Sequence, residues 1–248
     1  MPRWLRFLIV AALAGATAVS AQPRSRAASY PSNAPYDGRF TFVRLRWASG
    51  SSGSRGWSAA WNHDYPRAEQ HLTQIIKDLT LIDTRTDASR ILALDDPDLF
   101  KYPIAYMWEP GYWTMTDAEA GRFREYLLKG GFAIFDDFEK EQWHNFEAQM
   151  RRVLPEGRFV RLDASHRIFD TFFRMKTIEF PHPMFGYKPS YYGIYEDNDA
   201  SKRLMLIANY DNDVAEYWEW SDTGMFAVAP SNEAYKLGVN YIVYGLTH

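Results

Sequence analysis

The sequence predicts an α/β protein, a three-layer doubly wound domain built on a mostly parallel sheet. Apolar runs typical of buried strands alternate along the chain with segments whose apolar residues recur at helical spacing. The connections between successive strands are too long for hairpins, as parallel crossovers require. Residues 132–135 are continuously apolar, which is typical of a central parallel strand covered on both faces.

The first half of the domain is expected to alternate regularly. The expected strands are residues 40–47, 91–94, 104–108 and 132–135, and the expected helices begin at residue 64 or 65, at Thr116 and near residue 143. In the first strand, Val43 and Leu45 should face the core while Arg44 faces the opposite side. Thr116 and Glu119 have capping-box spacing, and the helix that they begin should end at Gly130, which suits a left-handed cap.

The second half has a less regular pattern. The expected strands are residues 159–162, 191–195, 204–209 and 226–229. Trp218 and Trp220 are two residues apart, so they should project from one face of a strand. Ser231 should cap a closing helix in which Gly238 and Gly245 permit close packing.

The first 21 residues are typical of a secretory signal. Arg3 and Arg6 form a positive start, an apolar stretch follows, and a small-residue cleavage site ends at Ala21. Residues 22–35 should form a flexible arm and residues 36–248 a single domain. No later apolar run is long enough to cross a bilayer. We therefore expect a periplasmic or secreted protein with no transmembrane span in the mature chain.

Charge and composition narrow the classes of partner and chemistry. Without the signal, the chain has 26 basic and 31 acidic side chains, which gives a net charge near −5. This charge argues against nucleic acid as a partner. The chain has no cysteine, which excludes disulfides, thiolate metal sites and a cysteine nucleophile.

Several segments together resemble an uncharacterised bacterial family, domain of unknown function 4159. The matching segments are residues 61–66, 130–137, 165–169 and 236–244. The resemblance implies a flavodoxin-like fold similar to the class I glutamine-amidotransferase-like domains, but no established activity. Because the cysteine nucleophile of such domains has no counterpart here, glutamine hydrolysis is excluded. The family pattern has a proline after the histidine where this chain has Arg167, which puts any role of His166 in doubt.

Candidate catalytic residues follow the expected strands, where open α/β sheets bind ligands. Glu109 ends one strand, Asp136 and Asp137 end the next, and His63 lies just before the first helix. A carboxylate at a strand end can hold Mg²⁺ or Ca²⁺, or act as a general base. It can equally cap a helix, and because neighbours on a strand point apart, we expect one of the two aspartates to cap and the other to face the crevice.

Aromatic residues make up 17% of the chain and suggest a binding surface or a tightly filled core. Trp108 and Trp113 flank Glu109, Trp218 and Trp220 form a second pair, and Asp211 lies in an oxygen-rich turn. The leading hypothesis is a non-catalytic binding or scaffolding domain whose aromatic-lined crevice holds a glycan or an envelope protein. The rival is a hydrolase using Glu109, Asp136 and His63, with or without a divalent cation as the only cofactor; a purely structural subunit is the third reading.

Overall fold

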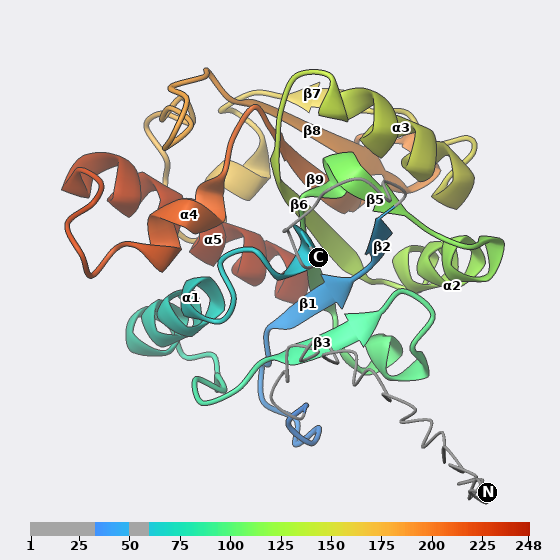
Figure 1. Cartoon of the computed structure of the whole chain (residues 1–248), viewed down its shortest axis with the longest axis horizontal. Helices are drawn as coiled ribbons and strands as arrows, with labels where there is room; N and C mark the ends of the chain where they lie inside the picture. The colour runs from blue at the N-terminus through green and yellow to red at the C-terminus, as the bar shows by residue number, and fades with distance from the viewer. Residues whose placement is uncertain (1–32, 50–59) are drawn as a thin grey trace, which may run out of the picture. The chain divides into compact units, whose positions relative to one another are not determined.

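A computed structural model describes residues 33–49 and 60–248 (Figure 1). Its strands are β1 (Val43–Arg46), β2 (Ala48–Ser49), β3 (Arg90–Ala93), β4 (Ile104–Trp108), β5 (Trp113–Thr114), β6 (Phe132–Phe138), β7 (Val160–Leu162), β8 (Ser190–Tyr195) and β9 (Leu204–Tyr210). Its α-helices are α1 (Arg67–Leu79), α2 (Asp117–Leu128), α3 (Gln142–Val153), α4 (Val214–Glu219) and α5 (Val228–Thr247). The predicted signal, residues 1–21, and the arm as far as residue 32 lie outside the described residues.

Seven strands form the main sheet in the order β3-β1-β4-β6-β9-β8-β7. The first five run parallel, β8 is antiparallel to β9, and β7 is antiparallel to β8. Helices flank this sheet, so the predicted α/β class with a mostly parallel sheet is confirmed. Strands β2 and β5 pair separately as a short antiparallel ribbon.

The helices lie in two layers, one on each face of the sheet (Figure 1). Helices α1, α4 and α5 contact one another on one face, where the ring of Tyr106 on β4 meets Trp218 on α4. Helices α2 and α3 cover the other face, where Phe135 on β6 packs against Phe123 and Phe146. This alternation along the central strands is what a sheet buried on both faces requires.

The strand order contains a reversal that locates the functional edge. From β1 the chain moves outward to β3 and then crosses back to β4 on the other side of β1. The five parallel strands, taken in chain order, have the arrangement 2-1-3-4-5, which opens a crevice beyond the carboxyl ends of the strands where the direction reverses. Residues that follow β1 and β4 are therefore placed at a ligand-binding position.

Close packing at two glycines of α5 is confirmed. A Cβ on Gly238 would lie 2.7 Å from Cζ2 of Trp218, and one on Gly245 would lie 2.7 Å from Cγ1 of Ile104. The absence of side chains at these positions lets α5 approach both α4 and the sheet.

The half-buried interpretation of β1 is wrong at Arg44, which packs against helix α1, although Arg46 on the same face is exposed. Arg44 is completely buried, and its guanidinium donates to Glu69 of α1 from Nε at 3.2 Å and from Nη2 at 2.6 Å. The guanidinium also lies 3.4 Å from the centre of the Trp108 ring. Arg44 is thus a buried charge that is paired and stacked, as burial of a charge demands.

Two strand predictions in the second half are also wrong. Trp218 lies within helix α4 and Trp220 ends it, and residues 228 and 229 belong to α5. Ser231 does not cap α5 but lies inside it, donating from Oγ to the carbonyl of Ala227 at 3.0 Å. Pro230 in the first turn is the signal for this earlier start, since proline is tolerated where backbone N–H groups have no helical partner.

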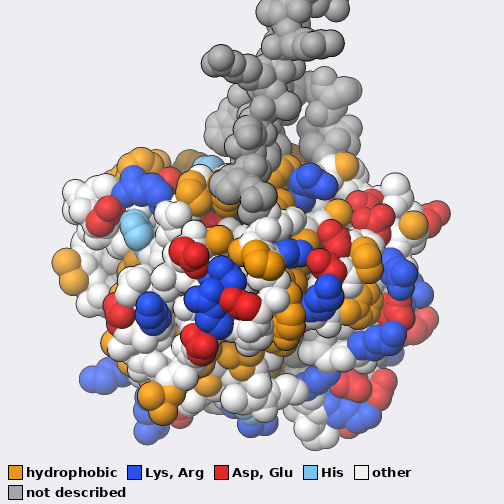
Figure 2. Space-filling view, turned by 90° about the horizontal axis from the view of Figure 1, so that it is seen from below, with side chains coloured by type: hydrophobic (Ala, Val, Ile, Leu, Met, Phe, Trp, Pro, Cys, Tyr) orange, Lys and Arg blue, Asp and Glu red, His pale blue; other side chains and the backbone are white. Residues whose placement is uncertain are grey.

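The described residues include no helix that is long and apolar enough to span a membrane. On the face seen in Figure 2, acidic and basic side chains are interspersed with small apolar areas. That face carries no extended field of one sign, although the expected lack of a nucleic-acid partner stays a prediction.

Gly130 has φ +110°, which confirms the predicted left-handed end of the helix begun by the Thr116 capping box. Gly130→Ala should lower the free energy of unfolding by about 1 kcal/mol, because alanine resists this backbone conformation. Gly121→Ala is the matched control within the same helix. The added Cβ would have no atom within 4 Å, and φ of Gly121 is not positive. The control should stabilise by about 0.5–1 kcal/mol. Chemical denaturation measures both, and the same sign for both changes would contradict this account.

Candidate functional site

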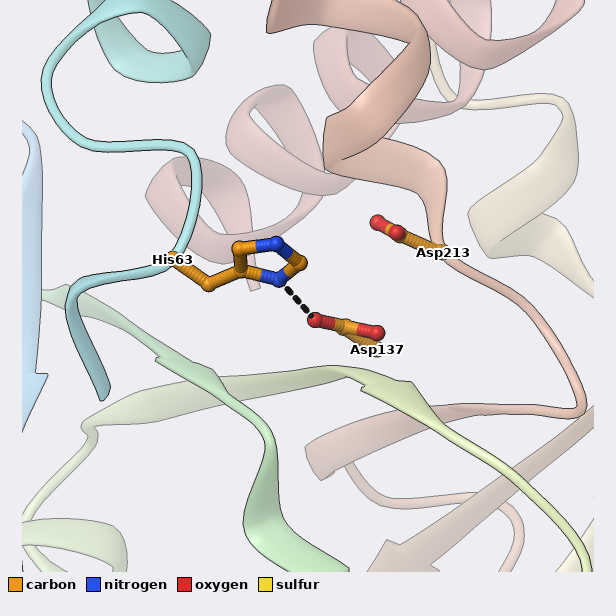
Figure 3. A group of neighbouring side chains, drawn as sticks. All are labelled: His63, Asp137 and Asp213. Carbon is orange, nitrogen blue, oxygen red and sulfur yellow. Dashed lines mark hydrogen bonds and ion pairs between the residues drawn. The ribbon is translucent and has the colours of Figure 1, made fainter. Parts of the chain in front are cut away.

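The candidate site gathers side chains from the carboxyl ends of three parallel strands and from the turn that precedes α1. His63 lies in the turn after the short helix η1 (Ala60–Asn62) that precedes α1, Glu109 follows β4, Asp137 ends β6 and Asp213 follows β9. Figure 3 shows the His63 ring pointing between the carboxylates of Asp137 and Asp213. The crevice position inferred from the strand order is therefore occupied by a histidine surrounded by acids.

Each nitrogen of His63 faces carboxylates. Nδ1 lies 2.7 Å from Oδ2 of Asp137, a hydrogen bond, and 3.6 Å from Oε1 of Glu109. Nε2 lies 3.7 Å from Oδ1 of Asp64. The His63 side chain is 37% exposed, so solvent reaches the ring although the surrounding carboxylates are largely buried.

Three of these acids have a left-handed backbone. Asp64 has φ 61°, Glu109 has φ 50° and Asp137 has φ 61°. Such values are uncommon outside glycine, and they cluster where a structure holds side chains in position for function. At Asp137 the conformation coincides with an irregularity in the pairing of β6 with β9, between Phe135 and Phe138.

Arg44 fixes the backbone of the turn that carries His63. Its Nη1 donates to the carbonyl of Trp61 at 3.0 Å and to that of His63 at 2.7 Å. The guanidinium thus anchors the turn through main-chain atoms and leaves the imidazole to the carboxylates above it.

Asp136, a predicted catalytic residue, has a different position from Asp137. Its side chain is completely buried and accepts four hydrogen bonds, from Tyr106 Oη at 2.6 Å and from Asn209 Nδ2, Val214 N and Ala215 N at 2.9 Å. The last two donors belong to the first turn of α4, so Asp136 does cap a helix, but one distant in sequence. The expectation of one capping and one crevice aspartate therefore describes the pair.

The N-terminus of α4 adds two acids to the site. Asp213 caps the helix, its Oδ1 accepting from the backbone N of Glu216 at 3.0 Å. Two sets of three side chains have ligand atoms within 4.8 Å of one another: His63 with Asp137 and Asp213, and His63 with Asp64 and Glu216. Both sets offer the nitrogen and carboxylate oxygens that divalent transition metals accept.

Burial and crowding of like charge shift the pKa values in the direction expected of a functional site. The hydrogen bond to Asp137 raises the pKa of His63 to about 10. Burial, followed by the charge of Asp137, raises the pKa of Glu109 to about 8. Burial and then Asp64 raise that of Glu216 to about 8. Burial also raises the pKa of Asp137, against the opposing effect of His63.

The predicted aromatic site residues do not open onto this cluster, although Trp108 contacts it through Nε1, which donates to Oδ2 of Asp64 at 2.8 Å. The side chains of Trp108, Trp113 and Trp218 are fully buried in the core, so they offer no face for stacking on a sugar. Trp220, at the end of α4, is partly exposed and has the guanidinium of Arg67 5.1 Å from its ring centre.

Asp211 stabilises a turn. It accepts from the backbone N of Lys140 at 3.1 Å and from its Nζ at 3.3 Å. This agrees with the turn alternative for the oxygen-rich segment rather than with a ligand-binding role.

Sequence reasoning did not select Asp64, Asp213 or Glu216. A helix that began at residue 64 or 65 would make Asp64 its cap, yet Oδ2 of Asp64 accepts from Nε1 of Trp108 at 2.8 Å, and α1 begins three residues later at Arg67. Asp213 and Glu216 are three residues apart, the spacing of a helix cap, which was the available signal for α4.

Comparison with known families gives one match. A family model described as "Domain of unknown function (DUF4159)" matches residues 41–246, most of the chain. No curated protein matches the chain. The family expected from the sequence is therefore confirmed.

Asp136 and Asp137 should respond differently to substitution. Asp136→Ala leaves four buried donors without an acceptor, so it should lower the free energy of unfolding by about 3 kcal/mol or more. Asp136→Asn, which keeps one acceptor oxygen, should cost less but still destabilise. Asp137→Asn should cost less than Asp136→Ala, because asparagine tolerates the left-handed backbone and relief of the crowded negative charge offsets part of the lost ion pair with His63. Urea unfolding of the three variants tests this, and equal losses at both positions would show that Asp136 is not an anchor.

His63 should remain protonated well above neutral pH. Its pKa is raised from 6.5 to about 10, so the stability that the charged ring contributes is complete below about 6.5 and is lost as the pH rises through about 10. NMR titration of the imidazole should show a midpoint far above that of an unperturbed histidine, and Asp137→Asn should lower it. A midpoint unaffected by that variant would mean that Asp137 does not hold the ring.

Proposed function

The chain belongs to the family of domain of unknown function 4159, and we propose that it is a hydrolase whose reaction centre is His63. One observation carries the proposal: His63, in the turn after η1, meets Glu109 and Asp137 from the carboxyl ends of β4 and β6, near the reversal point of the sheet. Residues distant in sequence and brought together at this edge are typical of an active site on an open α/β sheet.

Hydrolysis requires an acceptor for the proton that water loses and positive charge for the oxyanion of the transition state. Asp137, which pairs with His63 through Oδ2 alone, is the acceptor that we assign to the proton of water. A positive centre at Nε2 of His63 supports the oxyanion, and Asp137 holds the ring through Nδ1. Glu109, beside Nδ1, donates the proton that the leaving group takes. The step leaves one proton on Asp137 and none on Glu109, and transfer of that proton back to Glu109, directly or through solvent, restores the protein for the next turnover.

The binding hypothesis lacks the surface on which it depended. It required an aromatic-lined crevice, whereas Trp108, Trp113 and Trp218 are buried in the core. Asp136, which we had counted among the catalytic acids, is bound on both oxygens and has no part in the proposed reaction.

The sequence supports two further proposals, on the location of the protein and on its fold family. We propose that the chain is exported to the periplasm or beyond, on the basis of the signal pattern in residues 1–21. We also propose kinship with the glutamine-amidotransferase-like fold, which the arrangement of the parallel strands supports. The lack of cysteine still excludes the thiol chemistry of that class.

A panel of nitrophenyl esters, phosphates and glycosides, assayed with the full chain, tests the proposal. The wild type should hydrolyse at least one class, and His63→Ala and Asp137→Asn should each lower kcat by about 10²-fold or more. His144→Ala is the control, because His144 is exposed on α3 in the helix layer on the opposite face from α1 and α4. If no class is hydrolysed, or if the His63 and His144 variants behave alike, His63 is not a reaction centre.

A further inference from the structure

We propose that a divalent transition-metal ion, Zn²⁺ or Mn²⁺, binds between Nε2 of His63 and the carboxylates of Asp64 and Glu216. The inference rests on the proposed hydrolase in one respect: the ion would supply the positive charge that the proposed reaction needs beside Nε2 of His63. The three residues come from the turn after η1 and from the first turn of α4, and their ligand atoms lie within 4.8 Å of one another.

Asp64 carries the strongest indication of a ligand. Its side chain is 0% exposed, and its Oδ2 accepts from Nε1 of Trp108 at 2.8 Å. Its Oδ1 is buried, faces Nε2 of His63 and has no hydrogen-bond partner other than the acids Glu216 and Glu219, which can donate to it only when protonated. A buried carboxylate oxygen without a partner is costly, and coordination of a cation would satisfy it.

The distance between Asp64 and His63 fits two ligands of one ion. Their separation, 3.7 Å from Oδ1 to Nε2, is too long for a hydrogen bond. Two ligands about 2.1 Å from a tetrahedral ion are about 3.4 Å apart. A shift of a few tenths of an ångström, well within side-chain adjustment, would bring both atoms to coordination distance.

The other nitrogen of His63 is held as metal-bound histidines usually are. Nδ1 is 2.7 Å from Oδ2 of Asp137, and a neutral ring that donates there presents its lone pair at Nε2. A carboxylate partner on the opposite nitrogen orients a ligating imidazole and increases its basicity. Asp137 is therefore a positioning residue for the ion rather than a ligand.

Glu216 supplies the third ligand from a helix start that is rigidly placed. Asp213 holds its backbone N at 3.0 Å, and Asp136 holds the two preceding amides, Val214 and Ala215, at 2.9 Å. One nitrogen and two carboxylates suit Zn²⁺ or Mn²⁺ better than the all-oxygen preference of Mg²⁺ or Ca²⁺. Three protein ligands also leave a coordination position for water, as in catalytic sites.

The second set, His63 with Asp137 and Asp213, is the less suitable position. Oδ2 of Asp137 is already at hydrogen-bonding distance from Nδ1, so an ion there would have to separate the pair. Oδ1 of Asp213 is engaged with the backbone N of Glu216. The unsatisfied oxygen lies on the other side of the ring, at Asp64.

Calorimetric titration of the chelator-treated full chain with Zn²⁺ and with Mn²⁺ tests the site. Wild type should bind one ion of at least one of the two metals, and Asp64→Asn and Glu216→Gln should each weaken binding about tenfold or more. Glu147→Gln is the matched control, the same kind of change on helix α3, where Glu147 pairs with Arg151. The absorption spectrum of bound Co²⁺ provides a second readout, which the Glu216 variant should alter. Thermal melts without metal should show that the variants fold.

Three results would overturn the inference. They are no binding of either metal by wild type, equal affinity for the Glu216→Gln and Glu147→Gln variants, and loss of binding in Asp213→Asn but not in Glu216→Gln. Failure of the inference and failure of the proposed function are distinguishable. If hydrolysis persists in the presence of chelator, the metal site is wrong but the hydrolase proposal stands. If the ion binds but no substrate is hydrolysed, the metal site stands and the hydrolase proposal is wrong.

Discussion

The buried carboxylate of Asp136 is the interaction on which the arrangement of the site depends. It receives Tyr106 from β4, Asn209 from β9 and two amides from the start of α4. Tyr241 on α5 extends the network by donating to Asn209 at 2.7 Å. One side chain therefore fixes three adjacent strand ends and the helix that carries Glu216, and an acid outside the reaction determines where the reacting groups lie.

Around that anchor, the site has an arrangement that does not favour stability. Three acids adopt left-handed backbone conformations, and Asp137, Glu109 and Glu216 are crowded enough that burial raises their pKa values. Strain and like charge retained together at one sheet edge are typical of selection for function, with the rest of the fold supplying the stability.

The sequence located the strand ends but not the directions of the side chains. Continuous apolar runs and turn signals placed Glu109 and Asp137 at the carboxyl edge, because strand periodicity is strong there. Asp64 was misjudged, since nothing in Asp-Tyr-Pro distinguishes a helix cap from a left-handed residue aimed into a cluster. Glu216 was missed because Trp218 and Trp220 fit a period of two equally well, and only tertiary packing makes the segment a helix.

Arg44 gives the site a dynamic dependence on a helix that contributes no reacting group. Its charge is balanced by Glu69 on α1, while the same guanidinium holds the carbonyl of His63. If α1 separated from the sheet, Arg44 would lose Glu69 and remain as a buried charge without its counter-ion. Because the same guanidinium binds the carbonyl of His63, the turn of His63 would open in the same event. The helix and the turn thus form one cooperative opening unit, and amide exchange in both should report the same free energy of local unfolding.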